Sequence, residues 1–122
     1  MYRIFETKLS EWDSSKIKPL VVLGVRQCGK TFIIKNYFEK KYKNFISINL
    51  FRDDRLITIY ENEGLYERRK SLLCSTYNID FSDKNTLVFV DEVQKCPKFI
   101  MDLKAFCEEN ITNIVVAGSL LS

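Results

Sequence analysis

The sequence predicts an α/β fold, a three-layer sandwich built on a parallel sheet of about four strands. Short apolar runs of strand length alternate along the chain with segments whose apolar residues recur at helical spacing. One of these runs, Thr86–Val90, is apolar without alternation, which is typical of a parallel strand buried on both faces. A glycine-bounded loop also joins the first run directly to a helix, as in doubly wound folds.

Composition limits the size and the class of the protein. The 122 residues predict one domain, spanning 1–122, and a content of 46% hydrophobic and 29% charged residues allows a buried core in a soluble chain. The start of the chain lacks the apolar segment of a signal peptide, and no apolar run is long enough to cross a bilayer. We therefore expect a cytoplasmic protein without a membrane partner.

Charge and cysteine content exclude several functions. The formal net charge of +3 is only mildly basic, and two basic clusters, Lys40/Lys41/Lys43 and Arg68/Arg69/Lys70, are predicted to be solvated helix ends. The chain has no histidine, which removes Ser-His and Cys-His catalysis and most catalytic zinc sites. Its four cysteines form no C-x-x-C pair and are expected to be reduced thiols.

The elements follow from periodicity and from turn residues. Apolar residues at helical spacing predict helices, and runs rich in β-branched residues predict strands. In order, we expect a helix over Arg3–Glu11, a strand over Leu20–Leu23 after Pro19, a helix over Phe32–Phe38, a strand over Phe45–Leu50, a short helix around Leu56–Tyr60 ending near Gly64, a helix over Leu65–Tyr77, a strand over Thr86–Val90, a helix beginning at Pro97 with Phe99, Ile100, Leu103, Phe106 and Cys107 inward, and a strand over Ile114–Ala117.

The loop after the first strand matches G-x-x-x-x-G-K-[ST], the phosphate-binding P-loop. Its residues are Gly24, Val25, Arg26, Gln27, Cys28, Gly29, Lys30 and Thr31. Backbone N–H groups and a helix N-terminus can surround a phosphate there, Lys30 adds a full positive charge, and Thr31 offers a hydroxyl to Mg²⁺. The alternative is a Gly-rich turn with an incidental Lys-Thr pair, but the strand–loop–helix context favours the P-loop.

Two acidic residues end the apolar strand Thr86–Val90. The carboxyl ends of parallel strands share one edge of the sheet, so Asp91 and Glu92 are expected beside the P-loop. Asp91 can hold Mg²⁺, and Glu92 can orient or deprotonate an attacking water. After the next strand, Ser119 stands where a polar sensor of the γ-phosphate or the water would lie, although a small-residue turn explains it nearly as well.

Together these motifs resemble those of prokaryotic AAA-type P-loop ATPases that carry a C-terminal domain of unknown function. The matching segments are the loop octet, Asp91–Pro97 and Ala117–Leu121, against G-x-R-Q-V-G-K-T, D-E-[IV]-Q-x-x-P and G-S-x-L. The resemblance implies ATP and Mg²⁺ as ligands, Lys30 and Thr31 on the nucleotide and metal, Asp91 on the metal, Glu92 as base and Ser119 as sensor. It assigns no role to Arg26 or Gln27, and Gln94 either positions Glu92 or water or lies at the surface.

Two departures from the resemblance matter for activity. Cys28 stands where the family usually has Val, and a thiol beside Lys30 and a helix N-terminus is expected to have a lowered pKa. AAA-type modules usually continue with another core strand beside the P-loop strand, an arginine finger and a lid. We therefore expect a P-loop core ending before these parts, an exposed strand edge and weak hydrolysis by this chain alone. The chain is then either an expression fragment, a truncated gene product, or a protein completed by self-association or a protein partner.

Two other functions fit part of the pattern. A nucleic-acid-associated ATPase subunit or interaction module would use the basic clusters. A small-molecule kinase shares the P-loop, but the Asp91-Glu92 pair favours water as the phosphoryl acceptor.

Overall fold

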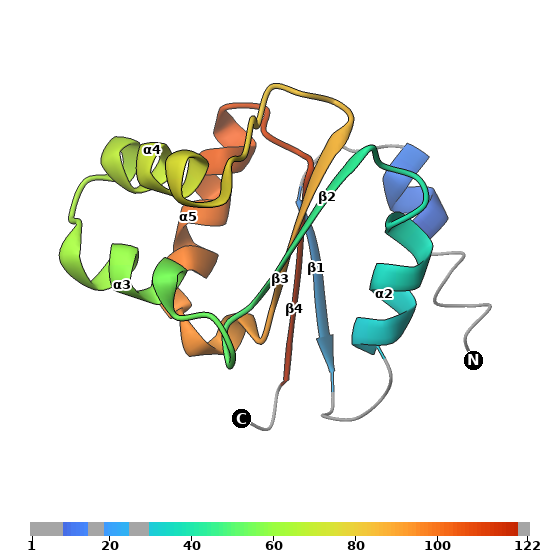
Figure 1. The fold of residues 1–122 in the computed structure, drawn as a ribbon, viewed down its shortest axis with the longest axis horizontal. Coiled ribbons are helices and arrows are strands. Elements are labelled where there is room, and N and C mark those ends of the chain that lie inside the picture. Colours follow the sequence, from blue (N-terminus) through green and yellow to red (C-terminus); the bar gives the residue numbers. More distant parts are fainter. Residues whose placement is uncertain (1–8, 15–18, 25–29, 120–122) are drawn as a thin grey trace.

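The computed structural model describes residues 9–14, 19–24 and 30–119, which form a parallel four-stranded sheet with helices on both faces (Figure 1). The sheet order is β1-β4-β3-β2. The strands are β1 (Leu20–Gly24), β2 (Asn44–Asn49), β3 (Thr86–Asp91) and β4 (Ile114–Ser119). The helices are α2 (Lys30–Phe38) and residues 9–14 on one face, and α3 (Arg55–Asn62), α4 (Tyr66–Tyr77) and α5 (Pro97–Glu108) on the other. This architecture confirms the predicted three-layer α/β fold.

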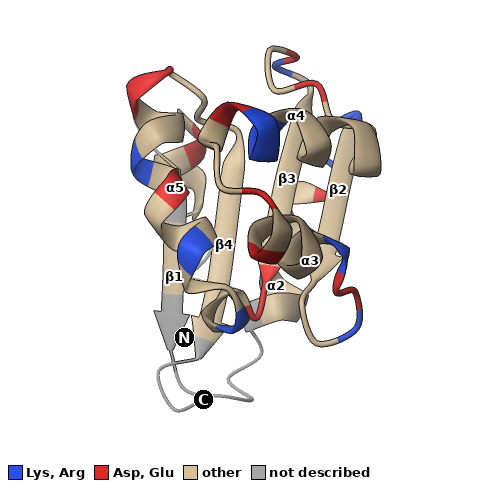
Figure 2. Cartoon of the chain, turned by 90° about the vertical axis from the view of Figure 1, so that its left-hand side faces the viewer, with Lys and Arg blue, Asp and Glu red and all other residues tan. Residues whose placement is uncertain are grey.

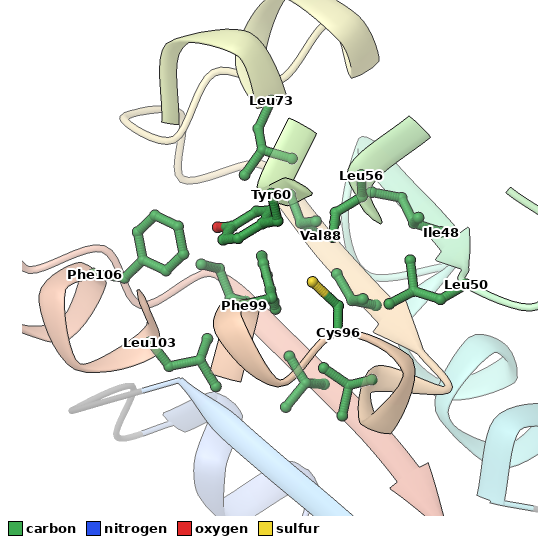
Figure 3. Packing of buried hydrophobic residues seen from close by; sticks show 14 of the residues in the cluster. Ile48, Leu50, Leu56, Tyr60, Leu73, Val88, Cys96, Phe99, Leu103 and Phe106 are labelled. Carbon is green, nitrogen blue, oxygen red and sulfur yellow. The ribbon is translucent and has the colours of Figure 1, made fainter. Parts of the chain in front are cut away.

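The sheet separates two hydrophobic clusters because successive side chains of a strand point to opposite faces. In β3, Val88 and Val90 pack with the α3–α5 layer, whereas Leu87 and Phe89 pack with α2. All of β3 is buried, as the continuous apolar run predicts. Figure 3 shows the cluster under α3–α5, where Tyr60, Phe99 and Phe106 meet between the helices. These packed layers hold the carboxyl ends of the strands in place.

Three local expectations differ from the structure. The helix expected to end at Glu11 continues through residue 14, where Ser14 Oγ donates to the Ser10 carbonyl and the Tyr42 hydroxyl donates to Asp13. Residues 1–8, the start of that helix, lie outside the described residues. Ile100 is 40% exposed instead of buried, because it lies about 100° around α5 from Phe99 and thus off the inward stripe. A short 3₁₀ turn, Val93–Lys95, was not expected.

The second basic cluster is not a solvated helix end. Arg69 donates from Nε and Nη2 to the two carboxylate oxygens of Asp102 on α5, at 2.9 and 2.8 Å, and its side chain is only 15% exposed. Lys70 pairs with Glu109 at 2.5 Å. Figure 2 shows basic and acidic residues interspersed over α3, α4 and α5. Arg69 and Lys70 therefore tie α4 to α5, whereas Arg68 is exposed.

Strand β1 lies at one edge of the described sheet, where β4 pairs with it in parallel. Val21 of β1 is 47% exposed on a face of the sheet. No helix among the described residues is long and apolar enough to span a membrane.

Candidate phosphate-binding site

The carboxyl ends of the strands bring most of the predicted site to one edge of the sheet. Gly24, the last residue of β1, pairs in register with Ser119, the last residue of β4. Lys30 is the first residue of α2, and its position after the loop matches the sequence prediction. The predicted loop residues Arg26, Gln27, Cys28 and Gly29 lie outside the described residues. The strand-to-helix context of the P-loop is therefore present on both sides of the loop.

Thr31 and Asp91 are in direct contact. Thr31 Oγ1 donates a hydrogen bond to Asp91 Oδ2 at 2.7 Å, although the two residues are 60 positions apart in the sequence. Asp91 is only 3% exposed, and its Oδ1 accepts from the Glu92 backbone N–H at 2.9 Å. Both carboxylate oxygens thus have donors, as a nearly buried carboxylate requires. The structure joins the hydroxyl of the loop motif to the first acid of the second motif.

Glu92 lies in a turn that its neighbours hold in place. Its backbone has φ 58° and ψ 42°, in the left-handed region that residues other than glycine seldom adopt. Its carbonyl accepts from the Lys95 N–H at 3.1 Å, and its side-chain Oε1 accepts from Gln94 Nε2 at 2.9 Å. Of the two alternatives for Gln94, the contact with Glu92 is the one that the structure contains.

Gly118 belongs to the motif Ala117–Leu121, but sequence reasoning gave it no role of its own. A Cβ added to this residue of β4 would lie 2.8 Å from Gln94 Oε1 and 3.1 Å from Val93 Cγ1. Gly118 comes directly before Ser119, so the end of β4 runs beside the Glu92 turn. The predicted strand ended at Ala117, and only the structure extends β4 through Gly118, where a glycine inside a strand allows a close approach of other groups.

The donor set at Thr31 and Asp91 fits Mg²⁺. A hydroxyl and a carboxylate oxygen in contact are hard oxygen ligands, and Mg²⁺ characteristically takes one or two protein groups together with waters and phosphate oxygens. Among the described residues, no group of three or more His, Cys, Asp and Glu residues forms a metal cluster.

Two hollows lie at the amino ends of the strands, opposite the candidate phosphate-binding site. Their volumes are about 370 and 500 Å³, and Asp83 lines both. The polar groups there bond to one another: Thr86 Oγ1 donates to Asp83 Oδ2, and Asn113 Nδ2 donates to the carbonyls of Asp83 and Thr86. Hydrogen bonds to Asn85 and Thr86 lower the pKa of Asp83. These bonds account for the polar residues as a turn network before β3 and β4.

Comparisons with known proteins agree with this geometry. The sequence profile of a family described as an AAA domain matches residues 16–122. Among solved structures, PCH-2 of C. elegans is similar, with a TM-score of 0.59 and 13% identity. The match covers 99% of this chain and 37% of the PCH-2 chain, so it shows a shared fold over about a third of that protein. No curated protein sequence matches this chain.

Proposed function

This chain belongs to the AAA domain family, and from this premise we propose that it binds ATP with Mg²⁺ and hydrolyses it at the edge formed by β1, β3 and β4. The observation that supports the proposal most strongly is the 2.7 Å hydrogen bond between Thr31 and Asp91. It joins a hydroxyl that follows a P-loop lysine to an acid at the end of a buried parallel strand. Those are the two protein groups that Mg²⁺ needs beside a nucleotide.

Each residue has a role in this mechanism. The loop N–H groups and the N-terminus of α2 bind the phosphates, with Lys30 neutralising charge on the β- and γ-phosphates. Thr31 and Asp91 would hold Mg²⁺, which supplies further neutralisation of charge when bound. Glu92 accepts a proton from the attacking water while the water oxygen bonds to the γ-phosphorus. The bond between the γ-phosphorus and the bridging oxygen breaks in the same step, and that oxygen leaves with ADP. Ser119, beside Gly24, is the sensor of the γ-phosphate.

Turnover by this chain alone is expected to be slow. Phosphoryl transfer needs a positioned metal, a positioned water and neutralisation of the transition-state charge. Among the residues of this sequence we assign the last role only to Lys30, because no arginine finger is identified. We therefore propose that a second copy or a protein partner supplies the missing charge, and that tight binding accompanies weak hydrolysis in the isolated chain.

Nucleotide binding and phosphate release test the proposal separately. Lys30→Ala is expected to weaken MgATP binding by roughly 100-fold, because it removes charge-assisted hydrogen bonds. Lys35→Ala, an exposed lysine further along α2, is the matched control and should bind like the wild type. Glu92→Gln should bind normally while phosphate release falls by about 10²–10⁴-fold, the usual contribution of a general base. Wild-type affinity in Lys30→Ala would show that the site is wrongly assigned.

The described residues weigh against parts of the other two candidate functions, although Lys40, Lys41 and Lys43 of the first basic cluster are exposed. Arg69 and Lys70, which would serve a nucleic-acid surface, are bound to Asp102 and Glu109. A kinase needs no base dedicated to water, whereas Glu92 stands next to Asp91. Binding to nucleic acid that falls steeply with salt would revive the first alternative. Phosphate transfer to an added acceptor faster than to water would revive the second.

A further inference from the structure

The carboxylate of Glu92 is restrained from two directions. Its backbone is held in the left-handed region by the bond from its N–H to Asp91 Oδ1 and by the bond that its carbonyl accepts from Lys95. Such a conformation persists in a residue with a Cβ only when surrounding contacts impose it, and it is concentrated at functional sites. The backbone therefore fixes the direction in which the Glu92 side chain leaves the main chain, and a second contact is needed to fix the position of its carboxylate.

Gln94 provides that second contact. Its Nε2 donates to Glu92 Oε1 at 2.9 Å, within the short 3₁₀ turn Val93–Lys95 that follows β3. A carboxylate has two oxygens, and one bound oxygen fixes the orientation of the group while the other can still accept a proton from water. The hydrogen bond thus holds the carboxylate without occupying both of its acceptors.

Gly118 in turn holds Gln94. The side-chain carbonyl of Gln94 lies against Gly118, at a point where an added Cβ would come within 2.8 Å of Oε1. The glycine is part of β4, pairs in register with Leu23 of β1, and has no positive φ. The position therefore needs glycine for space rather than for an unusual backbone conformation. One end of the Gln94 amide rests on β4 and the other reaches Glu92.

We propose that Gln94 is a positioning residue for Glu92, and that the absence of a side chain at Gly118 leaves the space that the Gln94 amide occupies. The proposal rests on the proposed function, in which Glu92 is the base. Displacing the amide leaves Glu92 present but misplaced, and a misplacement of about 1 Å can cost 10²-fold in rate. The proposal thus gives a role in turnover to two residues that have no assigned part in nucleotide binding.

The test separates turnover from binding. Gln94→Met keeps the length of the side chain and removes the donor, and it is expected to lower kcat roughly 10- to 100-fold while KM stays within about twofold. Gly118→Ala should lower kcat to a similar extent, because the far end of a flexible side chain moves readily from the new Cβ. Gly64→Ala is the matched control, since a Cβ there meets nothing within 4 Å, and it should match the wild type.

A double-mutant cycle checks that Gly118 acts through Gln94. In a Gln94→Ala background no amide remains to be displaced, so Gly118→Ala should change kcat by less than about twofold. An undiminished effect of Gly118→Ala in that background would overturn the proposal. A wild-type kcat in Gln94→Met would also overturn the proposal. A kcat above wild type would overturn it too, because the contact between Gln94 and Glu92 would then be inhibitory.

A measurement without turnover keeps this proposal distinct from the proposed function. The side-chain amide NMR signal of Gln94, assigned by its loss in Gln94→Met, is expected to shift in both Glu92→Ala and Gly118→Ala. An unmoved signal in either variant would overturn the positioning role even if the chain hydrolyses ATP. A shifted signal together with full phosphate release by Glu92→Gln would instead refute Glu92 as the base.

Discussion

Replacing Thr31 by Val tests the contact at the centre of the site. Val has nearly the same shape as Thr, so the change removes the hydroxyl that donates to Asp91 Oδ2 at 2.7 Å without opening a cavity. Asp91 is 3% exposed, so water has little access to replace the lost donor. The Glu92 N–H still donates to Oδ1, and the carboxylate therefore loses one of its two donors. The unfolding free energy should fall even with no nucleotide present.

The magnitude follows from the charge of the acceptor. A hydrogen bond to a charged group contributes about 1.5–3 kcal/mol, and the unfolding entropy of a chain this long is about 0.26 kcal/mol per kelvin. The two values together predict that the melting temperature falls by roughly 6–12 °C. Thr31→Ser keeps the hydroxyl and should recover most of this loss.

Differential scanning calorimetry without nucleotide or Mg²⁺ measures the effect. Thr58→Val is the matched control, because Thr58 is exposed on α3 and its hydroxyl donates only to a neighbouring backbone carbonyl. In an Asp91→Asn background the cost of Thr31→Val should shrink, because the acceptor is no longer charged. A Thr31→Val protein that melts within about 2 °C of the wild type would refute the reasoning, since it would mean that the hydroxyl stabilises nothing before the nucleotide binds.

Two further predictions concern the ion pair between Arg69 and Asp102 and the thiol of Cys28. Asp102→Ala removes the carboxylate that pairs with the nearly buried Arg69 and should lower the unfolding free energy by about 2–4 kcal/mol, measured by urea unfolding. A double variant with Arg69→Met and Asp102→Leu should recover at least half of the loss. A cost of Asp102→Ala below about 0.5 kcal/mol would contradict a structural role for the pair. Cys28 should react with iodoacetamide faster than Cys74 and Cys96, because burial raises the pKa of those two thiols, and MgATP should protect it. Equal labelling of all thiols with and without MgATP would argue against a reactive thiol in the loop.

Local patterns predicted the elements well because periodicity depends on near neighbours. The run Thr86–Val90 indicated a strand buried on both faces, and all of β3 is buried. Ile100 shows the limit, since an apolar residue next to an inward stripe can face either way and only the packing of α5 decides. Arg69 shows another limit, because its acidic partner lies 33 residues away and no local pattern points to it.

The sequence alone determined three features: the loop octet, the acidic pair Asp91-Glu92 at the end of β3, and the alternation of strands with helices. Each of them is a short-range pattern with a direct physical meaning. Only the tertiary structure decided that β4 lies between β1 and β3, that Thr31 donates to Asp91, and that Gln94 rests between Glu92 and Gly118. These contacts join strand ends and turns from different parts of the chain. Their existence depends on sheet order and on the backbone of one strained turn, which residue spacing does not encode.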